Sequence, residues 1–452
     1  MPELKVIFNV KSLNSKFQIR LHVRFFSITQ RQQGADDMTA TYDIFQQVFA
    51  LSQISNNLIR MEGKKEYLQL QMNSYVQHYL NYDSTPTPDI TALLGEWSVV
   101  WGPVVFQAPT SNVSDNAMLV ARSTATLPDG STKDVCVVAI AGTAAMSNFD
   151  WNCEDGIGGK TGAAIEQVVS WTDFLATPSE TVVSQPIAGQ PYISLGTATG
   201  LYTLLVEMTD QNKTLADYLG TVSADILVVT GHSLGGALSA ALGLYLAQNK
   251  VAPQIPITYV YATAGASPGN DVFAQIFTKT LPPQIGPSPS KSWNVDIWNT
   301  RDVVPQAWSI APADPSIRTI CNVNGIYNND STTPAPTQIT TLSSNMYNWS
   351  KNSGVTYTPI EGSRFTAPFT YVIKDDDFSL PINVPPKQLS GFAAQALYQH
   401  STAYSLEIFG EAPRLPAYSA DPVQGVTKES ICELYSYFKN LLGMTAPCDA
   451  QE

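Results

Sequence analysis

The stretch from Ile226 to Gly236, Ile-Leu-Val-Val-Thr-Gly-His-Ser-Leu-Gly-Gly, constrains the fold of this chain more than any other. Its first four residues are a continuous apolar run, which is typical of a strand covered on both faces of a parallel sheet. A helix rich in small residues is predicted over Ala237–Ala247. Glycines on both sides of Ser233 permit a sharp, strained turn between strand and helix that lifts the serine hydroxyl above the sheet edge. The bare Gly-x-Ser-x-Gly pattern also occurs in chance loops, but its position here makes Ser233 the candidate nucleophile.

A serine hydroxyl attacks a carbonyl group only when a base removes its proton and an acid orients that base. The histidines of the chain are His22, His78, His232 and His400. Where a serine lies on this kind of turn, the order along the chain is serine, acid, histidine, and only His400 follows Ser233 with room for an acid between them. His232 adjoins the serine on a tight turn, so we expect its side chain to point away from the hydroxyl and to pack beneath the turn.

The acid is one of several aspartates between the serine and His400. They are Asp271, Asp296, Asp302, Asp314, Asp330 and the run Asp375–Asp377. Asp302 follows the predicted strand Trp293–Asn299, at the carboxyl end where the active-site loops of parallel sheets gather. Asp296 lies inside that strand. Asp302 is the candidate acid, and the alternative role for it is a salt bridge with Arg301.

Alternating strand and helix patterns predict an α/β fold with a mostly parallel central sheet flanked by helices and right-handed crossovers. Strands are predicted over Ser98–Phe106, Ala117–Arg122, Asp134–Ala141, Ile257–Gly265 and Trp293–Asn299, and helices from Thr39 to Leu58, over Glu66–Tyr82, 196–219, Asn270–Phe277, Gly391–Tyr404 and Lys428–Leu442. The third of these strands ends in Gly142-Thr143. Thr143 is therefore expected to face Ser233 across the carboxyl edge of the sheet.

Three segments carry a resemblance to a known family. Val229–Leu238, with Asp302 and His400, resembles the class 3 lipases, the family of filamentous-fungal triacylglycerol lipases. Tyr261–Asn270 and Asn299–Pro305 are similar to the family's strand-then-Gly-Asn segment and to its acid loop. The resemblance covers roughly residues 130–310 and the segment around His400.

The resemblance implies an α/β-hydrolase fold with a nucleophile elbow, and a catalytic triad of Ser233, Asp302 and His400. It also implies an oxyanion hole formed by the backbone N–H groups of Thr143 and Leu234. The family usually has an arginine before the Gly-Thr pair, where this chain has Ala141.

The implied activity is hydrolysis of carboxylic ester bonds in acylglycerols or related lipid esters, through an acyl-enzyme on Ser233 and without a metal or cofactor. A phospholipase, an aryl-ester esterase or an acyltransferase would use the same triad. A lipid-binding relative without turnover is an alternative from another class.

The composition limits the classes of molecule that the chain is expected to bind. The net charge of −13 repels phosphate backbones, so nucleic acid is not an expected partner. No apolar run reaches the roughly 18 residues of a membrane-spanning helix. The five cysteines lack Cys-x-x-Cys spacing, which argues against a zinc cluster. The expected partner is a lipid or other ester substrate, including one at a lipid–water interface, and the oligomeric state stays open.

Residues 1–37 are basic and almost free of acids, unlike the rest of the chain. This N-terminal extension is an organelle transit segment, a strand-like extension, or a stretch that precedes a true start at Met38. Residues 38–452 are predicted to form a single α/β-hydrolase domain, in which 309–390, rich in Pro, Ser, Thr and Asn, are a loop-rich cap or insertion.

Composition and four Asn-x-Ser/Thr triplets favour an extracellular protein. The triplets begin at Asn112, Asn212, Asn329 and Asn348. Because the N-terminus has no visible signal-peptide hydrophobic region, a cytoplasmic location is the alternative.

Overall fold

A seven-stranded sheet organises the fold in the computed structural model, which describes residues 42–80, 93–143, 164–328, 335–369, 389–410 and 432. The strand order is β1-β2-β3-β9-β10-β11-β12. These strands are β1 (Ser98–Phe106), β2 (Asn116–Thr126), β3 (Thr132–Ile140), β9 (Ile226–His232), β10 (Ile257–Thr263), β11 (Val295–Asn299) and β12 (Gly362–Phe365). The five strands from β3 to β12 run parallel, and β1 and β2 are antiparallel to their neighbours. The predicted α/β class with a mostly parallel sheet is confirmed.

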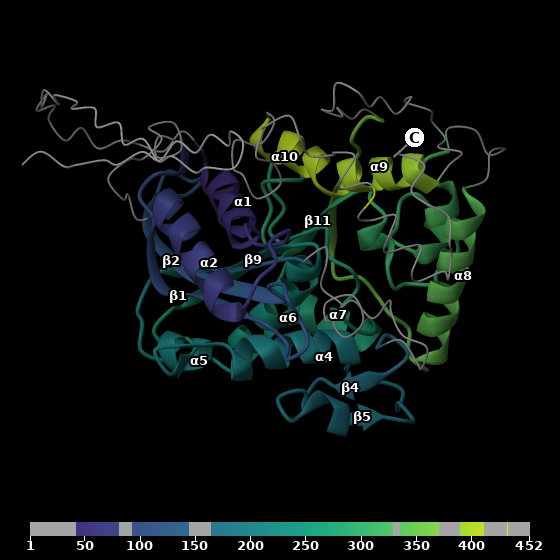
Figure 1. Ribbon diagram of the computed structural model, residues 1–452, viewed down its shortest axis with the longest axis horizontal. Helices are drawn as coiled ribbons and strands as arrows, with labels where there is room; N and C mark the ends of the chain where they lie inside the picture. The colour runs from purple at the N-terminus through teal and green to yellow at the C-terminus, as the bar shows by residue number, and fades with distance from the viewer. Residues whose placement is uncertain are drawn as a thin grey trace, which may run out of the picture. The chain divides into compact units, whose positions relative to one another are not determined.

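The two faces of the sheet bury separate hydrophobic cores. On β9, Ile226 and Val228 belong to one core, and Leu227 and Val229 belong to the other. Successive side chains of a strand point to opposite faces, so a strand covered on both sides needs a continuous apolar run. Helices α1 and α2 cover one face of the sheet, and α4 and α6 cover the other (Figure 1). The helices are α1 (Ile44–Ser55), α2 (Lys65–Leu80), α4 (Leu195–Tyr202), α5 (Leu215–Leu219), α6 (Leu234–Gln248), α7 (Asp271–Thr280), α8 (Thr337–Asn352), α9 (Leu389–His400) and α10 (Thr402–Phe409).

Smaller elements extend from this frame. A three-stranded sheet pairs β4 (Val168–Ser170) with β5 (Val182–Val183) and β6 (Tyr192–Ser194), and β7 (Thr209–Asp210) pairs with β8 (Lys213–Thr214). Short helical turns are η2 (Pro178–Glu180), η3 (Thr203–Glu207), η4 (Val304–Gln306) and η5 (Ile320–Gly325). None of the helices within the described ranges is long and apolar enough to cross a membrane.

Helix α1 begins at Ile44, later than predicted. Its N-cap is Asp43, whose Oδ1 accepts the Gln46 N–H at 3.1 Å in a capping box. The predicted cap, Thr39, lies outside the described residues, as do residues 1–37 and all but one residue of the predicted helix 428–442.

The prediction of one helix over 196–219 is wrong in its middle. Helix α4 ends at Tyr202, a π-helical turn follows, and the β7–β8 hairpin precedes α5. Gln211 and Asn212 form the hairpin turn with φ of 49° and 62°. Asn tolerates this left-handed region, so the turn signal at Asn212 overrides the helical pattern around it.

The loop-rich interpretation of 309–390 is also wrong for part of the segment. Helix α8 and strand β12 lie in it, and β12 is the last strand of the central sheet. On α8, Ile339, Leu342 and Met346 are buried at a helical spacing. The many Ser, Thr and Asn residues of α8 occupy the remaining positions and conceal this pattern in the composition.

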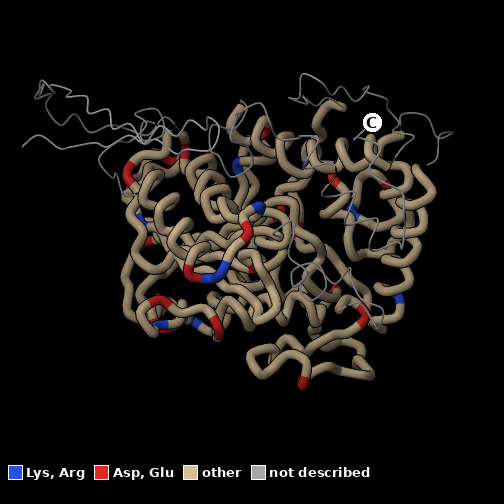
Figure 2. Tube along the Cα trace, in the orientation of Figure 1, with Lys and Arg blue, Asp and Glu red and all other residues tan. Residues whose placement is uncertain are grey.

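One ion pair is buried under the carboxyl edge of the sheet. Charged residues are few, 14% of the chain, and they are scattered as short red and blue segments along the tube (Figure 2). The pair joins Arg318 Nη1 to Asp296 Oδ2 at 2.5 Å, and Asp296 Oδ1 accepts the Gly265 N–H at 3.0 Å. Burial raises the pKa of Asp296 to about 6, against the opposing effect of the Arg318 charge. Each of the two buried charges is therefore compensated by the other.

Replacing Arg318 by Met is expected to lower the free energy of unfolding by about 3–5 kcal/mol, because Asp296 is left as an unpaired buried carboxylate. Urea unfolding followed by circular dichroism measures the change. Arg364→Met, at an exposed arginine of β12, is the matched control and should change stability by less than about 0.5 kcal/mol. Equal stability of the two variants would contradict the structural role of the pair.

Candidate active site

The serine lies on a strained turn between β9 and α6. Ser233 has φ 63° and ψ −124°, in the left-handed half of backbone space that favours glycine, at a cost of about 1–3 kcal/mol. A Cβ at Gly231 would lie 2.2 Å from the Gly235 carbonyl oxygen, so this position must be glycine. The Ser233 N–H donates to the Thr263 carbonyl at 3.0 Å. These contacts hold the serine hydroxyl at the carboxyl edge of the sheet.

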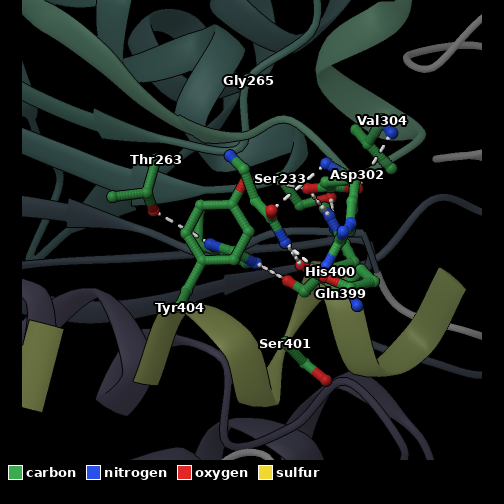
Figure 3. A network of polar contacts seen from close by, with 12 residues as sticks. Ser233, Thr263, Gly265, Asp302, Val304, Gln399, His400, Ser401 and Tyr404 are labelled. Atoms are coloured by element: carbon green, nitrogen blue, oxygen red, sulfur yellow. Dashed lines mark hydrogen bonds and ion pairs between the residues drawn. The ribbon is translucent and has the colours of Figure 1, made fainter. Parts of the chain in front are cut away.

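The structure brings Ser233, His400 and Asp302 together (Figure 3). His400 Nε2 lies 2.8 Å from Ser233 Oγ, and His400 Nδ1 lies 2.8 Å from Asp302 Oδ2. Asp302 is completely buried, and its Oδ1 accepts the Val304 N–H at 3.0 Å. The side chain of His400 is 18% exposed, so solvent reaches the histidine and not the acid.

Two alternatives were an ion pair between Asp302 and Arg301, and Asp296 as the acid, but both of these residues are engaged elsewhere. Arg301 donates to the Ala367 carbonyl, and its guanidinium lies 3.5 Å from the centroid of the Phe369 ring. Asp296, the other aspartate near this strand end, pairs with Arg318. The geometry thus selects Asp302 as the carboxylate beside His400.

Tyr404 is a site residue that sequence reasoning missed. Its hydroxyl donates to Asp302 Oδ2 at 2.9 Å and accepts the Asn299 N–H at 3.0 Å. Burial raises the pKa of the phenol well above its ordinary value, and the charge of Asp302 adds to this effect. His400 ends α9 and Tyr404 lies on α10, so no helical spacing in the sequence marks the contact of Tyr404 with Asp302.

Gly142 lies directly against the elbow. A Cβ on Gly142 would lie 2.7 Å from the His232 carbonyl oxygen and 3.3 Å from the Ser233 Cβ. Thr143 is the next residue along the chain, and Leu234 is the first residue of α6, directly after Ser233. Their role as oxyanion donors stays a prediction.

Asn56, at the end of α1, is a second missed residue. Its Oδ1 accepts the Gly142 N–H at 2.6 Å, and its Nδ2 donates to the Ser52 carbonyl at 2.8 Å. The side chain is completely buried. Because both ends of the amide are bonded, Asn56 fixes the peptide that leads into Thr143.

His232 is buried behind the site, and its ring nitrogens contact groups other than the Ser233 hydroxyl. Its Nε2 lies 2.7 Å from the His400 carbonyl oxygen and its Nδ1 lies 2.9 Å from Thr263 Oγ1. Burial lowers the pKa of His232 well below its ordinary value, and the neighbouring His400 lowers it further. The ring is therefore neutral at pH 7.

Within the ranges that the structure describes, no group of three His, Cys, Asp or Glu side chains is arranged to hold a metal ion.

Comparisons with known proteins give a family match for part of the chain. A family model described as lipase (class 3) matches residues 159–311. The match covers 153 of the 452 residues, and this part of the chain is similar to the class 3 lipases. The match supports a lipase-type hydrolase, and the fold is that of the α/β-hydrolases. The matched region contains Ser233 and Asp302.

The chain is also similar to solved lipase structures. The M37 lipase superposes with a TM-score of 0.58 at 23% identity, covering 89% of this chain and 98% of the other. A lipase from Rhizopus microsporus var. chinensis gives 0.33 at 14% identity, covering 58% and 69% of the two chains. The LIP2 lipase of Yarrowia lipolytica gives 0.35 at 17% identity, covering 59% and 77%. No curated protein matches in sequence.

The lowered pKa of His232 predicts an acid-sensitive contribution to stability. Below pH of about 6.5 the unfolded chain binds a proton at this position that the folded chain does not, so stability falls as the pH falls. Between pH 7 and pH 5 the wild type should therefore lose more stability than His232→Gln. Urea unfolding at several pH values measures the difference.

His78→Gln, at an exposed histidine of α2, is the control and should follow the wild-type pH dependence. Parallel pH profiles for wild type and His232→Gln would show that His232 does not remain neutral in the folded protein.

Proposed function

We propose that this chain is a class 3 lipase that hydrolyses carboxylic ester bonds of acylglycerols or related lipid esters through an acyl-enzyme on Ser233. The hydrogen-bonded series Asp302–His400–Ser233 carries the proposal. A carboxylate oxygen accepts hydrogen bonds, so the Asp302 contact places the proton of His400 on Nδ1. The lone pair of Nε2 then faces the serine hydroxyl, as a general base requires.

In the proposed first half-reaction, Oγ of Ser233 attacks the ester carbonyl carbon while His400 Nε2 takes the hydroxyl proton. The tetrahedral intermediate collapses when the ester C–O bond breaks, and the alcohol leaves with the proton from Nε2. In the second half, water attacks the acyl-enzyme and gives its proton to Nε2. The acid is released as Oγ recovers that proton. The buried carboxylate of Asp302 stabilises the imidazolium in both halves.

The backbone N–H groups of Thr143 and Leu234 are proposed to stabilise the negative oxygen of each intermediate. Leu234 is the first residue of α6, where N–H groups have no partner within the helix and the helix dipole is positive. Loss of one such donor costs about 3 kcal/mol of transition-state stabilisation. Asn56 acts as a positioning residue for Thr143, because it holds the preceding Gly142 N–H.

The lipid-ester preference rests on the family, whose model is described as lipase. The superposed M37 structure is also a lipase. A phospholipase, an aryl-ester esterase or an acyltransferase with the same groups would differ in the leaving alcohol or in the acceptor, and not in the chemistry of Ser233.

Ser233→Ala should lower kcat by a factor of about 10⁶, because no acyl-enzyme forms without the hydroxyl oxygen. Hydrolysis of triolein, monoolein, phosphatidylcholine and methyl ferulate, measured side by side, checks both the loss and the preferred ester.

A fluorophosphonate should label the wild type and not Ser233→Ala, and the melting temperature shows whether the variant is folded. Turnover retained by a folded Ser233→Ala protein would refute the acyl-enzyme. Faster hydrolysis of methyl ferulate than of the lipid esters would refute the proposed substrate class, and faster hydrolysis of phosphatidylcholine than of the acylglycerols would favour the phospholipase alternative.

Asp302→Asn should lower kcat by a factor of about 10⁴, since an amide in this place no longer selects the productive tautomer of His400. Steady-state kinetics on p-nitrophenyl esters measure the loss. Asp296→Asn is the matched control, because it removes the neighbouring buried carboxylate and should affect stability more than kcat. The opposite order of kcat losses would assign the acid to Asp296.

A further inference from the structure

Two buried side chains of the sheet bind the carbonyl groups at the end of α9, the helix that carries His400. The last carbonyl groups of a helix have no partner within it. On α9, the Gln399 carbonyl accepts from Asn299 Nδ2 at 3.0 Å, and the His400 carbonyl lies 2.7 Å from His232 Nε2. Asn299 and His232 are the last residues of β11 and β9. The carboxyl edge of the sheet thus holds the backbone of His400 as well as its imidazole.

The partners of His232 determine where its proton lies. A carbonyl oxygen only accepts hydrogen bonds, so Nε2 must carry the proton that points to the His400 carbonyl. The ring is neutral, since burial and the nearby His400 lower its pKa. Nδ1 is therefore unprotonated, and its lone pair can accept a hydrogen bond. Thr263 Oγ1, 2.9 Å away, must donate to this lone pair. The Gly231 carbonyl, at 3.3 Å, is a more distant acceptor for the same hydroxyl.

Packing leaves the ring of His232 little freedom. The centroids of the Tyr404 and His400 rings lie 5.0 Å and 4.8 Å from it, and that of Phe49 of α1 lies 6.3 Å away. A neutral ring also avoids repulsion from the imidazolium that forms on His400 during the proposed reaction. His232 is thus placed to act on the geometry of the base without taking its proton.

We infer that His232 is a positioning residue for His400, and that the Thr263 hydroxyl keeps it in the Nε2–H tautomer that this task requires. The inference rests on the proposed function, in which His400 is the base. In the other tautomer, the Nε2 lone pair would face the His400 carbonyl oxygen at 2.7 Å, and two acceptors at that distance repel each other. The end of α9 would then shift away. A displacement of the base by about 1 Å lowers the rate by about 100-fold.

Thr263→Val tests the inference, because it removes the hydroxyl donor while keeping a similar volume. Thr263→Ser keeps the donor and is the control. We expect Thr263→Val to lower kcat by about 10-fold to 100-fold with KM within about twofold, and Thr263→Ser to stay within about threefold of wild type. In a His232→Gln background, where the ring is absent, Thr263→Val should add no more than about twofold.

The ¹⁵N chemical shifts of histidine-labelled protein at pH 7 report the tautomer independently of activity, with His232 assigned from the signal lost in His232→Gln. The wild type and Thr263→Ser should show a protonated Nε2 and an unprotonated Nδ1, and Thr263→Val should show a population with the proton on Nδ1. A wild-type Nδ1–H or doubly protonated ring would overturn the inference, as would equal kcat for Thr263→Val and Thr263→Ser. If Thr263→Val does not fold, the wild-type spectrum still decides. Turnover by Ser233→Ala would instead refute the proposed function and leave the tautomer result intact.

Discussion

The left-handed backbone at Ser233 is the constraint on which the rest of the site depends. A residue with a side chain adopts this conformation only where its surroundings hold it there. The surroundings here are backbone groups: the Gly235 carbonyl occupies the space above Gly231, and the Thr263 carbonyl accepts the serine N–H. The end of β10 must therefore lie close to the end of β9, and β3 pairs with β9 on its other side.

From that centre, the site is assembled from the ends of parallel strands. Gly142 follows β3, His232 and Thr263 end β9 and β10, and Asp302 follows β11. Parallel strands end at one edge, so residues far apart in the sequence converge there. Helices supply the rest, with Asn56 at the end of α1 and His400 at the end of α9. Because each of these polar groups is buried or nearly so, each must find a hydrogen-bond partner among the others.

The parts of the site with a local signal could be predicted from the sequence. The buried strand, the glycines and the serine are contiguous, and Asp302 follows a strand end. Asn56 could not be found in this way, because its partner Gly142 is 86 positions away and an asparagine at a helix end is ordinary. Tyr404 reaches Asp302 across 102 positions. Helix α8 was missed because its polar face dominates its composition. Contacts that only the tertiary fold creates leave little trace in a local pattern.

The family match over residues 159–311 contains the serine and the acid, but the base and the Gly142 peptide lie outside it. A series of hydrogen bonds links the matched region to the segment that carries His400. The Thr263 hydroxyl donates to His232, whose remaining proton points to the His400 carbonyl. His400 in turn donates to Asp302 and accepts from Ser233. Each imidazole has one proton and one lone pair, so the direction of every bond follows once the carbonyl and carboxylate acceptors are fixed. In the proposed mechanism, the tautomer of His400 is thus set by Asp302, and that of His232 by Thr263 and the His400 carbonyl.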